Sequence, residues 1–154
     1  DPYLAYSGNP TEEDSAYYCF APPIVEAANR YLTEHGQPAA ARDISGATQT
    51  MLMNCLCAGY PVVMWATLGF REPCQGNLKW TLTDNTLYTA YNNLHCFVLK
   101  GYDGENFSVA DPLFGDLTVD YATLMQQYMA VGSHAAVLEL HRAEAPWADS
   151  RRLV

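Results

Sequence analysis

Two residues that could do acid–base chemistry, His95 and Asp111, stand at the ends of a predicted β-hairpin. The turn residues Asp103 and Gly104 separate two apolar segments, which is the pattern of two antiparallel strands joined by a tight loop. The start of one strand and the end of the next lie close together in such a hairpin. An imidazole beside a carboxylate is the base and orienter of a nucleophilic catalytic site. The pair therefore predicts a site whose nucleophile comes from elsewhere in the chain.

The length of the hairpin loop decides how the two strands pair. A three-residue loop over Tyr102–Gly104, with its glycine in the left-handed conformation, would place His95 directly opposite Asp111. Their Cβ atoms would then be about 5 Å apart. A two-residue loop would make the pair diagonal. Because Asp111 precedes Pro112, its backbone is restrained to an extended conformation, and its carboxylate could hold the imidazole in one tautomer.

Cys19 is the favoured nucleophile among the five cysteines. It precedes a helix expected to begin near Pro22-Pro23, because proline is tolerated in the first turn of a helix. The partial positive charge at a helix N-terminus stabilises a thiolate. Cys55 and Cys57 lie late in a predicted helix. Cys96 follows His95 and should face away from it, and Cys74 falls in a loop of unassigned structure.

The elements that must position these residues follow from apolar periodicity and from glycine and proline breaks. A loop is expected over residues 38–46, and Gly36 should cap the first helix. Helices that come first and strands that come later favour an α+β fold over a doubly wound sheet. The expected helices are 22–36, 47–57 and 121–129, and the expected strands are 61–67, 79–82, 87–91, the two hairpin strands, 118–119 and 135–140.

Length and composition predict one domain over residues 1–154, with its core at about 7–140 and a loosely attached tail at 143–154. The chain is 49% hydrophobic and only 16% charged, which is typical of a globular protein. A net charge of −9 argues against nucleic acid and against an anionic membrane surface as partners. The longest apolar stretch, residues 60–68, is too short to cross a membrane. The cysteine spacing does not match a structural zinc site, so no metal or cofactor is predicted.

Together these motifs resemble the papain-like cysteine peptidases of the bacteriocin-processing type, in particular their free-standing bacterial relatives that are not fused to a transporter. The resemblance spans about residues 7–140. It is most specific over residues 95–115, where a strand beginning with His95 continues to Gly-Tyr-Asp and the next strand ends in Asp-Pro-Leu. The other similar blocks are residues 8–10, 18–22 and 59–65.

The resemblance implies a papain-like fold in which N-terminal helices pack on a mostly antiparallel β-sheet. It implies Cys19 as the nucleophile, His95 as general base and then acid, and Asp111 as the orienter of the imidazole. A peptide or protein substrate would be cleaved through a thioester acyl-enzyme. The expected location is outside the cytoplasm of a bacterium. Bacteriocin-processing relatives cut after paired small residues, a preference that need not carry over to this branch.

The oxyanion side of the predicted site departs from the family pattern. The family has a glutamine a few residues before the cysteine, but every glutamine here follows Cys19, and Glu13 lies near the expected place. The Cys19 backbone N–H and Asn9 are the alternative donors. Losing one such donor costs about 10²–10³ in rate, so a weak or inactive peptide-binding module is one alternative function. An acyl transferase or transpeptidase that uses the same triad is another.

Two aromatic residues are candidates for the walls of a substrate cleft. Tyr18 neighbours the predicted nucleophile, and Trp80 lies in one of the expected short strands. Ordinary core or sheet contacts are the competing interpretation for both side chains. The remaining histidines near the end of the chain, His134 and His141, are expected at the surface or at strand ends.

Overall fold

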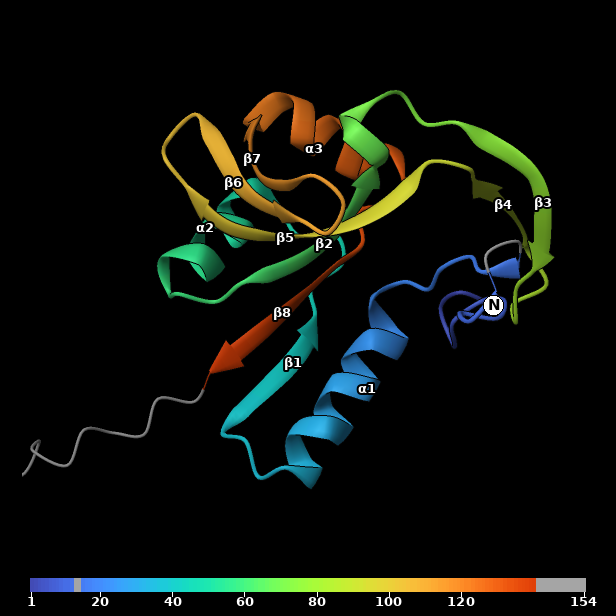
Figure 1. Cartoon of the computed structure of the whole chain (residues 1–154), viewed down its shortest axis with the longest axis horizontal. Helices are drawn as coiled ribbons and strands as arrows, with labels where there is room; N and C mark the ends of the chain where they lie inside the picture. Colours follow the sequence, from blue (N-terminus) through green and yellow to red (C-terminus); the bar gives the residue numbers. More distant parts are fainter. Residues whose placement is uncertain (13–14, 141–154) are drawn as a thin grey trace, which may run out of the picture.

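The computed structural model describes residues 1–12 and 15–140 (Figure 1). The fold class is the predicted α+β, with three α-helices and strands that pair antiparallel. The elements in chain order are α1 (Ala21–Glu34), β1 (Ala39–Asp43), α2 (Gln49–Cys57), β2 (Val62–Thr67), the 3₁₀ turn η2 (Leu68–Phe70), β3 (Gln75–Thr81), β4 (Leu87–Tyr91), β5 (Leu94–Tyr102), β6 (Asn106–Asp111), β7 (Gly115–Asp120), α3 (Tyr121–Ala130) and β8 (Ala135–Leu140).

Six strands form the main sheet in the order β1-β8-β2-β5-β6-β7, and β3 pairs with β4 in a separate two-stranded ribbon. The two edges of β2 contact different strands, since one pairs with β8 over residues 62–64 and the other with β5 over the whole length of β2. Figure 1 shows β5 extending beyond the main sheet toward the β3–β4 ribbon. The start of β5, which carries His95, therefore lies where the main sheet meets this ribbon.

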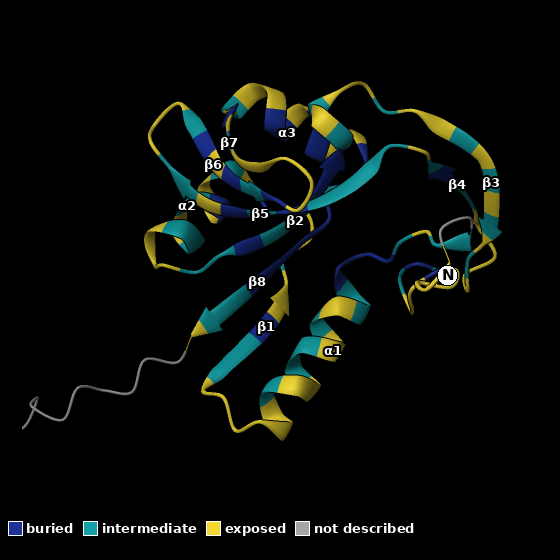
Figure 2. Cartoon of the chain, in the orientation of Figure 1, coloured by how far each residue is buried: buried dark blue, intermediate teal, exposed yellow. Residues whose placement is uncertain are grey.

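The helices cover opposite faces of the main sheet, as side-chain alternation along β2 shows. Met64 and Ala66 belong to a core formed with α2 and α3, whereas Val63 and Trp65 contact Phe20 and the first residues of α1. Figure 2 shows buried positions on the central strands and on α3, while much of the surface of α1 is exposed. The larger core lies on the α2 and α3 side, and a smaller aromatic core lies under the start of α1.

Helix α1 begins and ends as its sequence predicts. It has proline in its first turn, its C-cap is His35, and the following Gly36 has a φ of 60°. Its N-cap, Phe20, makes no side-chain cap, and the N–H of Phe20 instead donates to the carbonyl of Pro2 at 2.8 Å. The start of α1 is thus stabilised by the N-terminal segment of the chain.

The loop expected over residues 38–46 is wrong in part, because residues 39–43 form the edge strand β1. Alanine-rich sequence has low strand propensity, so the strand is not visible locally. It forms because β8 pairs with one edge and Asn29 of α1 covers the other. The Asn29 side chain donates to the carbonyl of Ala41 at 2.9 Å and accepts from the Ala41 N–H at 2.8 Å.

The predicted register of the β5–β6 hairpin is also wrong, although the hairpin itself is confirmed. Val98 pairs with Ala110, and an irregularity follows Leu99 before pairing resumes at Gly101. The loop spans residues 103–105 and so lies one residue later than predicted, because Asp103 Oδ1 accepts two backbone N–H groups, at 2.9 and 2.7 Å, and holds the turn there. His95 and Asp111 are therefore diagonal, not directly opposite.

The other expected elements agree with the structure apart from their bounds. Strands β3 and β7 extend the short strands predicted near them, and β4 and β8 have the predicted bounds. The tail predicted at 143–154 lies outside the described residues. Among the residues that the structure describes, no helix is long and apolar enough to cross a membrane.

Candidate active site

The base-and-orienter pair predicted from the sequence is assembled in the structure. His95 Nε2 and Asp111 Oδ2 are 2.8 Å apart, and the two side chains are 12% and 1% exposed. Continuing the β5–β6 register would place Asp111 opposite Phe97, two residues from His95 and on the same strand face. Diagonal neighbours on one face are within reach of long side chains, so the pair forms despite the shifted register.

Asp111 also organises the turn that leads from β6 to β7. Its Oδ1 atom accepts the backbone N–H groups of Leu113 at 2.8 Å and Phe114 at 3.0 Å. Burial raises the pKa of Asp111, but these two donors and His95 lower it by more, so the net pKa lies below its usual value. An ionised carboxylate only accepts hydrogen bonds, so His95 donates from Nε2 and its Nδ1 atom is free to act as a base.

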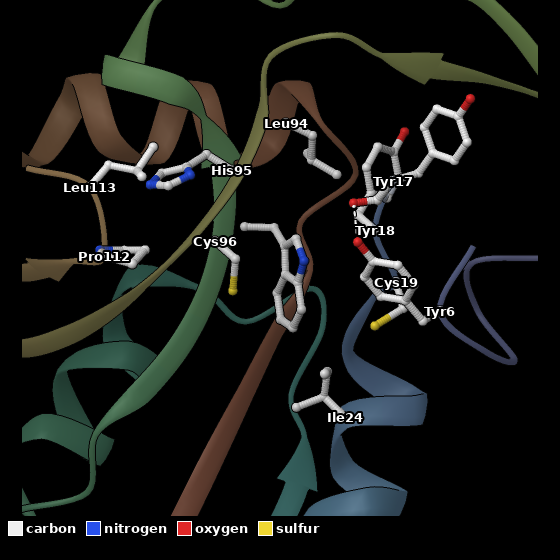
Figure 3. Close-up of a pocket in the computed structure, with 11 residues that line it drawn as sticks. Tyr6, Tyr17, Tyr18, Cys19, Ile24, Leu94, His95, Cys96, Pro112 and Leu113 are labelled. Carbon is white, nitrogen blue, oxygen red and sulfur yellow. Dashed lines mark hydrogen bonds between the residues drawn. The ribbon is translucent and has the colours of Figure 1, made fainter. Parts of the chain in front are cut away.

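His95 opens onto a cavity of about 430 Å³ between the start of α1, the start of β5 and the β6–β7 turn (Figure 3). Most of its surface comes from aromatic and aliphatic side chains. The lining residues are Tyr6, Tyr17, Tyr18, Cys19, Ile24, Trp65, Leu94, His95, Cys96, Pro112 and Leu113.

Cys19 lines the same cavity but does not contact His95. Among the described residues no hydrogen bond joins its thiol to the imidazole, and Figure 3 shows the two side chains toward different ends of the cavity with Cys96 between them. Cys19 is 8% exposed, and burial raises the pKa of its thiol. In this arrangement Cys19 is a buried neutral thiol and not an activated thiolate.

Strand alternation explains why Cys19 and His95 are apart. Cys96 contacts the aromatic core at the start of α1, whereas Phe97 belongs to the core on the α2 and α3 side. His95 therefore projects from the same face of β5 as Phe97, and Cys96 from the face shared with Cys19. Burial raises the pKa of Cys96 to about 12, and Cys19, when ionised, would add to this shift.

Of the two residues predicted for the oxyanion side, Asn9 does not line the cavity. Asn9 is exposed and accepts from Thr11 N at 3.1 Å and Thr11 Oγ1 at 2.8 Å in a local turn, outside the residues that line the cavity. Glu13 lies outside the described residues. Within the described part of the chain, the backbone N–H of Cys19 has no hydrogen-bond acceptor. It is the donor closest in sequence to the predicted nucleophile.

Of the two predicted cleft residues, Tyr18 lines the cavity and Trp80 does not. The Tyr18 hydroxyl is 2.9 Å from that of Tyr88 and accepts from the Tyr91 N–H at 3.1 Å. Burial raises the pKa of Tyr18 more than the hydrogen bonds to Tyr88 and Tyr91 lower it. Trp80 stacks on Tyr88 with an interplanar angle of 3°. Its ring also makes edge contacts with Tyr17 and Tyr18, so Trp80 packs behind the cavity wall.

His134 differs from the surface position expected for it, although it does immediately precede β8. It is 5% exposed and stacks on Phe20, with ring centroids 3.7 Å apart. Burial lowers its pKa to about 4, although Asp43 raises it to a smaller extent. The neutral His134 ring is thus part of the small core that supports the residue following Cys19. His141 lies outside the described residues.

Several cavity residues were not identified from the sequence, chiefly Tyr6, Ile24 and Leu113. Tyr6 reaches the cavity because residues 7 and 17–18 exchange backbone hydrogen bonds, which holds the N-terminal segment beside Cys19. Leu113 could have been noticed, since a large apolar residue two positions after Asp111 in a turn has no partner nearby in sequence. Among the described residues, no three histidine, cysteine or acidic side chains are placed to hold a metal ion.

Comparison with known proteins gives the family of this chain. The model of the Peptidase C39 like family matches residues 1–136. A crystal structure from Bacillus anthracis, provisionally described as a C39-like peptidase, is similar with a TM-score of 0.76 and 26% sequence identity. The similarity covers 94% of this chain and 70% of that one. No curated protein matches. The family match over most of the chain and the shared fold show that this chain belongs to the C39-like peptidase family.

Proposed function

We propose that this chain is a cysteine peptidase in which Cys19, His95 and Asp111 act together on a peptide substrate. The observation that carries the proposal is the His95–Asp111 hydrogen bond of 2.8 Å at the cavity that Cys19 also lines. Membership of the C39-like peptidase family supports the same reaction class. The second observation in its favour is the ionised Asp111, which leaves His95 Nδ1 as the available base.

The proposed reaction assigns one role to each residue. His95 Nδ1 takes the thiol proton of Cys19, and the sulfur attacks the carbonyl carbon of the scissile amide. The backbone N–H of Cys19 donates to the oxyanion, and the His95 imidazolium returns the proton to the leaving amine. Water, deprotonated by His95, then hydrolyses the thioester and releases the acid. Asp111 keeps the imidazole in the required tautomer throughout.

This mechanism requires the thiol to move toward the imidazole. Cys19 and His95 reach the cavity from opposite faces of β5, so substrate binding must favour a rearranged state in which they are close. The segment that precedes Cys19 is joined to the sheet chiefly through residues 1–8 and the β3–β4 ribbon, and we place the movement there.

A second candidate function is peptide binding without turnover. The observation that favours it is the buried Cys19 thiol, whose pKa is raised and which makes no contact with His95 in the described structure. The absence of a glutamine before Cys19 points the same way, since the family uses that amide at the oxyanion. The cavity would then hold a peptide side chain, with His95 and Asp111 serving as polar anchors.

A peptidyl acyloxymethyl ketone distinguishes the peptidase from the binding module, because this probe alkylates a cysteine that a neighbouring histidine activates. We expect mass-spectrometric mapping to find the label on Cys19. His95→Ala should abolish labelling. The exposed His35, which contacts Tyr31 far from the cavity, provides the control variant His35→Ala, which should label normally. Labelling of Cys19 that is unchanged in His95→Ala, or labelling found only on Cys57 and Cys74, would contradict the peptidase proposal and favour the binding module.

A further inference from the structure

We propose that the cavity between Cys19 and His95 selects a bulky apolar side chain of the bound peptide, and that Ile24 and Leu113 determine this preference. The inference rests on the proposed recognition of a peptide at this cavity. It assigns a substrate class, peptides with a leucine-like or phenylalanine-like side chain at the reactive site. This differs from the paired small residues recognised by bacteriocin-processing relatives.

The chemistry of the cavity wall favours an uncharged occupant. Among the described residues that line it there is no carboxylate, ammonium or guanidinium group. The only imidazole, His95, is already paired with Asp111. A charged side chain placed here would lose its hydration without gaining a partner, which is strongly unfavourable.

The polar atoms of the wall are largely engaged within the protein. The Tyr6 hydroxyl donates to the carbonyl of Tyr17 at 3.0 Å. The Tyr18 hydroxyl is shared with Tyr88 and the Tyr91 N–H. What these side chains present to an occupant is therefore mainly ring surface, which contacts apolar groups favourably.

The size of the cavity argues against a small side chain. A volume of about 430 Å³ lies within the range of roughly 300–1,000 Å³ that is typical of ligand sites. Glycine or alanine would leave most of this space to water in contact with apolar walls. A large aliphatic or aromatic side chain would remove that surface from water, which stabilises the complex in proportion to the area buried.

Two exposed aliphatic residues stand at the two halves of the site. Ile24, in the first turn of α1, is 39% exposed, and Leu113, in the β6–β7 turn, is 67% exposed. Figure 3 shows Ile24 near Cys19 and Leu113 near His95. A side chain that contacts both would lie between the thiol and the imidazole.

Leu113 is held in a defined position relative to the base. Its N–H donates to Asp111 Oδ1, while Asp111 Oδ2 contacts His95. Contact of the substrate with Leu113 therefore positions the peptide relative to the turn that Asp111, the residue that orients the imidazole, holds in place. Ile24 lies near the thiol, because it belongs to the first turn of the helix that Cys19 precedes (Figure 3).

The test measures binding in the Cys19→Ala protein, so that its result does not depend on turnover. Blocked pentapeptides acetyl-Ala-Ala-Xaa-Ala-Ala-amide, with Phe, Leu, Gly or Asp at the centre, are titrated while the isoleucine and leucine methyl groups are followed by NMR. We expect the Phe and Leu peptides to bind at least about tenfold more tightly than the Gly and Asp peptides. The Ile24 and Leu113 methyl resonances should shift on binding.

Matched variants assign the preference to the two residues. Leu113→Ser and Ile24→Ser should each weaken binding of the Phe peptide by about tenfold. Leu87→Ser is the control, since Leu87 is 63% exposed at the start of β4 and outside the cavity. Equal affinity for all four peptides, or an equal loss in Leu87→Ser, would overturn the inference. Selective binding together with failed labelling of Cys19 would uphold it while refuting the peptidase.

Discussion

The two halves of the candidate site are built in different ways. The acid–base half lies on adjacent strands, β5 and β6, and Asp111 makes three hydrogen bonds that orient His95 and the following turn. The thiol half lies just before α1, where the side chain of Cys19 makes no hydrogen bond with the described residues and burial raises its pKa. The residues on either side of Cys19 are aromatic: the rings of Tyr18 and Phe20 contact each other, and Phe20 stacks on His134.

This difference separates two requirements of a cysteine peptidase. A base needs a fixed tautomer and orientation, which a hydrogen-bonded sheet supplies. A nucleophile needs a stabilised thiolate close to that base, and an apolar environment opposes the thiolate. The hydrogen bond between His95 and Asp111 is already formed in the described structure, whereas the proposed mechanism needs substrate binding to change the environment of the thiol.

The largest effect is expected from removing the charge of Asp111. Asp111→Asn keeps an oxygen for the N–H groups of Leu113 and Phe114 but favours the wrong tautomer of His95. In a serine-protease triad the corresponding change lowers kcat by about 10⁴-fold. We expect a loss of 10²-fold or more in the rate of peptidyl-ketone labelling at Cys19.

The control for this change is Asp116→Asn, because the Asp116 side chain is 79% exposed and forms an ion pair with Lys100 at the surface. Its labelling rate should equal that of the wild type. An unchanged rate in Asp111→Asn would show that the orienter is not needed, and the acid–base half would lose its assigned role.

The next largest effect is a loss of folding stability at acid pH, caused by the buried His134 beside the thiol half. The pKa of His134 is lowered by burial to about 4, against 6.5 for an ordinary histidine. The unfolded chain therefore binds the extra proton first, and stability present above pH 6.5 is lost as the pH falls toward 4. The expected loss of unfolding free energy is about 3 kcal/mol across this window.

Urea unfolding at several pH values between 7 and 4 measures this dependence. In His134→Gln the loss over the same window should shrink, because glutamine does not titrate. The exposed His35 serves as the control, and His35→Gln should retain the wild-type slope. Identical slopes in all three proteins would refute the assignment to His134.

A tenfold effect is expected for the reactivity of the resting thiol. In the free protein, iodoacetamide at pH 7 should modify Cys19 at least about tenfold more slowly than Cys57 or Cys74, because those two are exposed and Cys19 is buried. The rate at Cys19 should rise only at alkaline pH. Mapping after brief exposure measures the order, and modification in urea should make the sites equal. Fastest modification at Cys19 would mean that the thiolate is already activated without substrate.

The smallest effect tests how the segment before Cys19 is held. Tyr18→Phe removes the hydroxyl that contacts Tyr88 and accepts from the Tyr91 N–H. We expect a loss of about 1 kcal/mol in the free energy of unfolding. Tyr31→Phe is the control, since Tyr31 is 59% exposed on α1. Equal stability of the two variants would show that these hydrogen bonds do not hold the thiol half.

Much of the fold could be predicted from local patterns. Helix α1 was predicted from the prolines in its first turn and from Gly36 after its end. Strand β2 was predicted from an apolar run bounded by glycines, and β8 was predicted with the bounds it has. Strand β1 was missed because its alanines carry no strand signal, and it exists through β8 and Asn29. The hairpin register was missed because the Asp103 side chain holds the turn one residue later than the position of the glycine alone would indicate.

The candidate site was predictable to a similar extent. The His95–Asp111 pair could be inferred because a hairpin brings the ends of its strands together whatever the loop length, within a residue or two. The cavity could not, since Tyr6, Ile24 and Leu113 come from three distant segments. The stacking of His134 on Phe20 was equally invisible, because 114 residues separate the two rings in sequence.

The sequence by itself determined the family, the α+β class and the pairing of His95 with Asp111, because each depends on motifs or on neighbours along a hairpin. Only the tertiary structure decided on which face of β5 each side chain projects relative to α1. That choice depends on how a helix and a strand distant in sequence pack together. It places Cys96 on the side of Cys19 and leaves His95 on the other, so the environment of the thiol follows from the fold and not from its position before a helix.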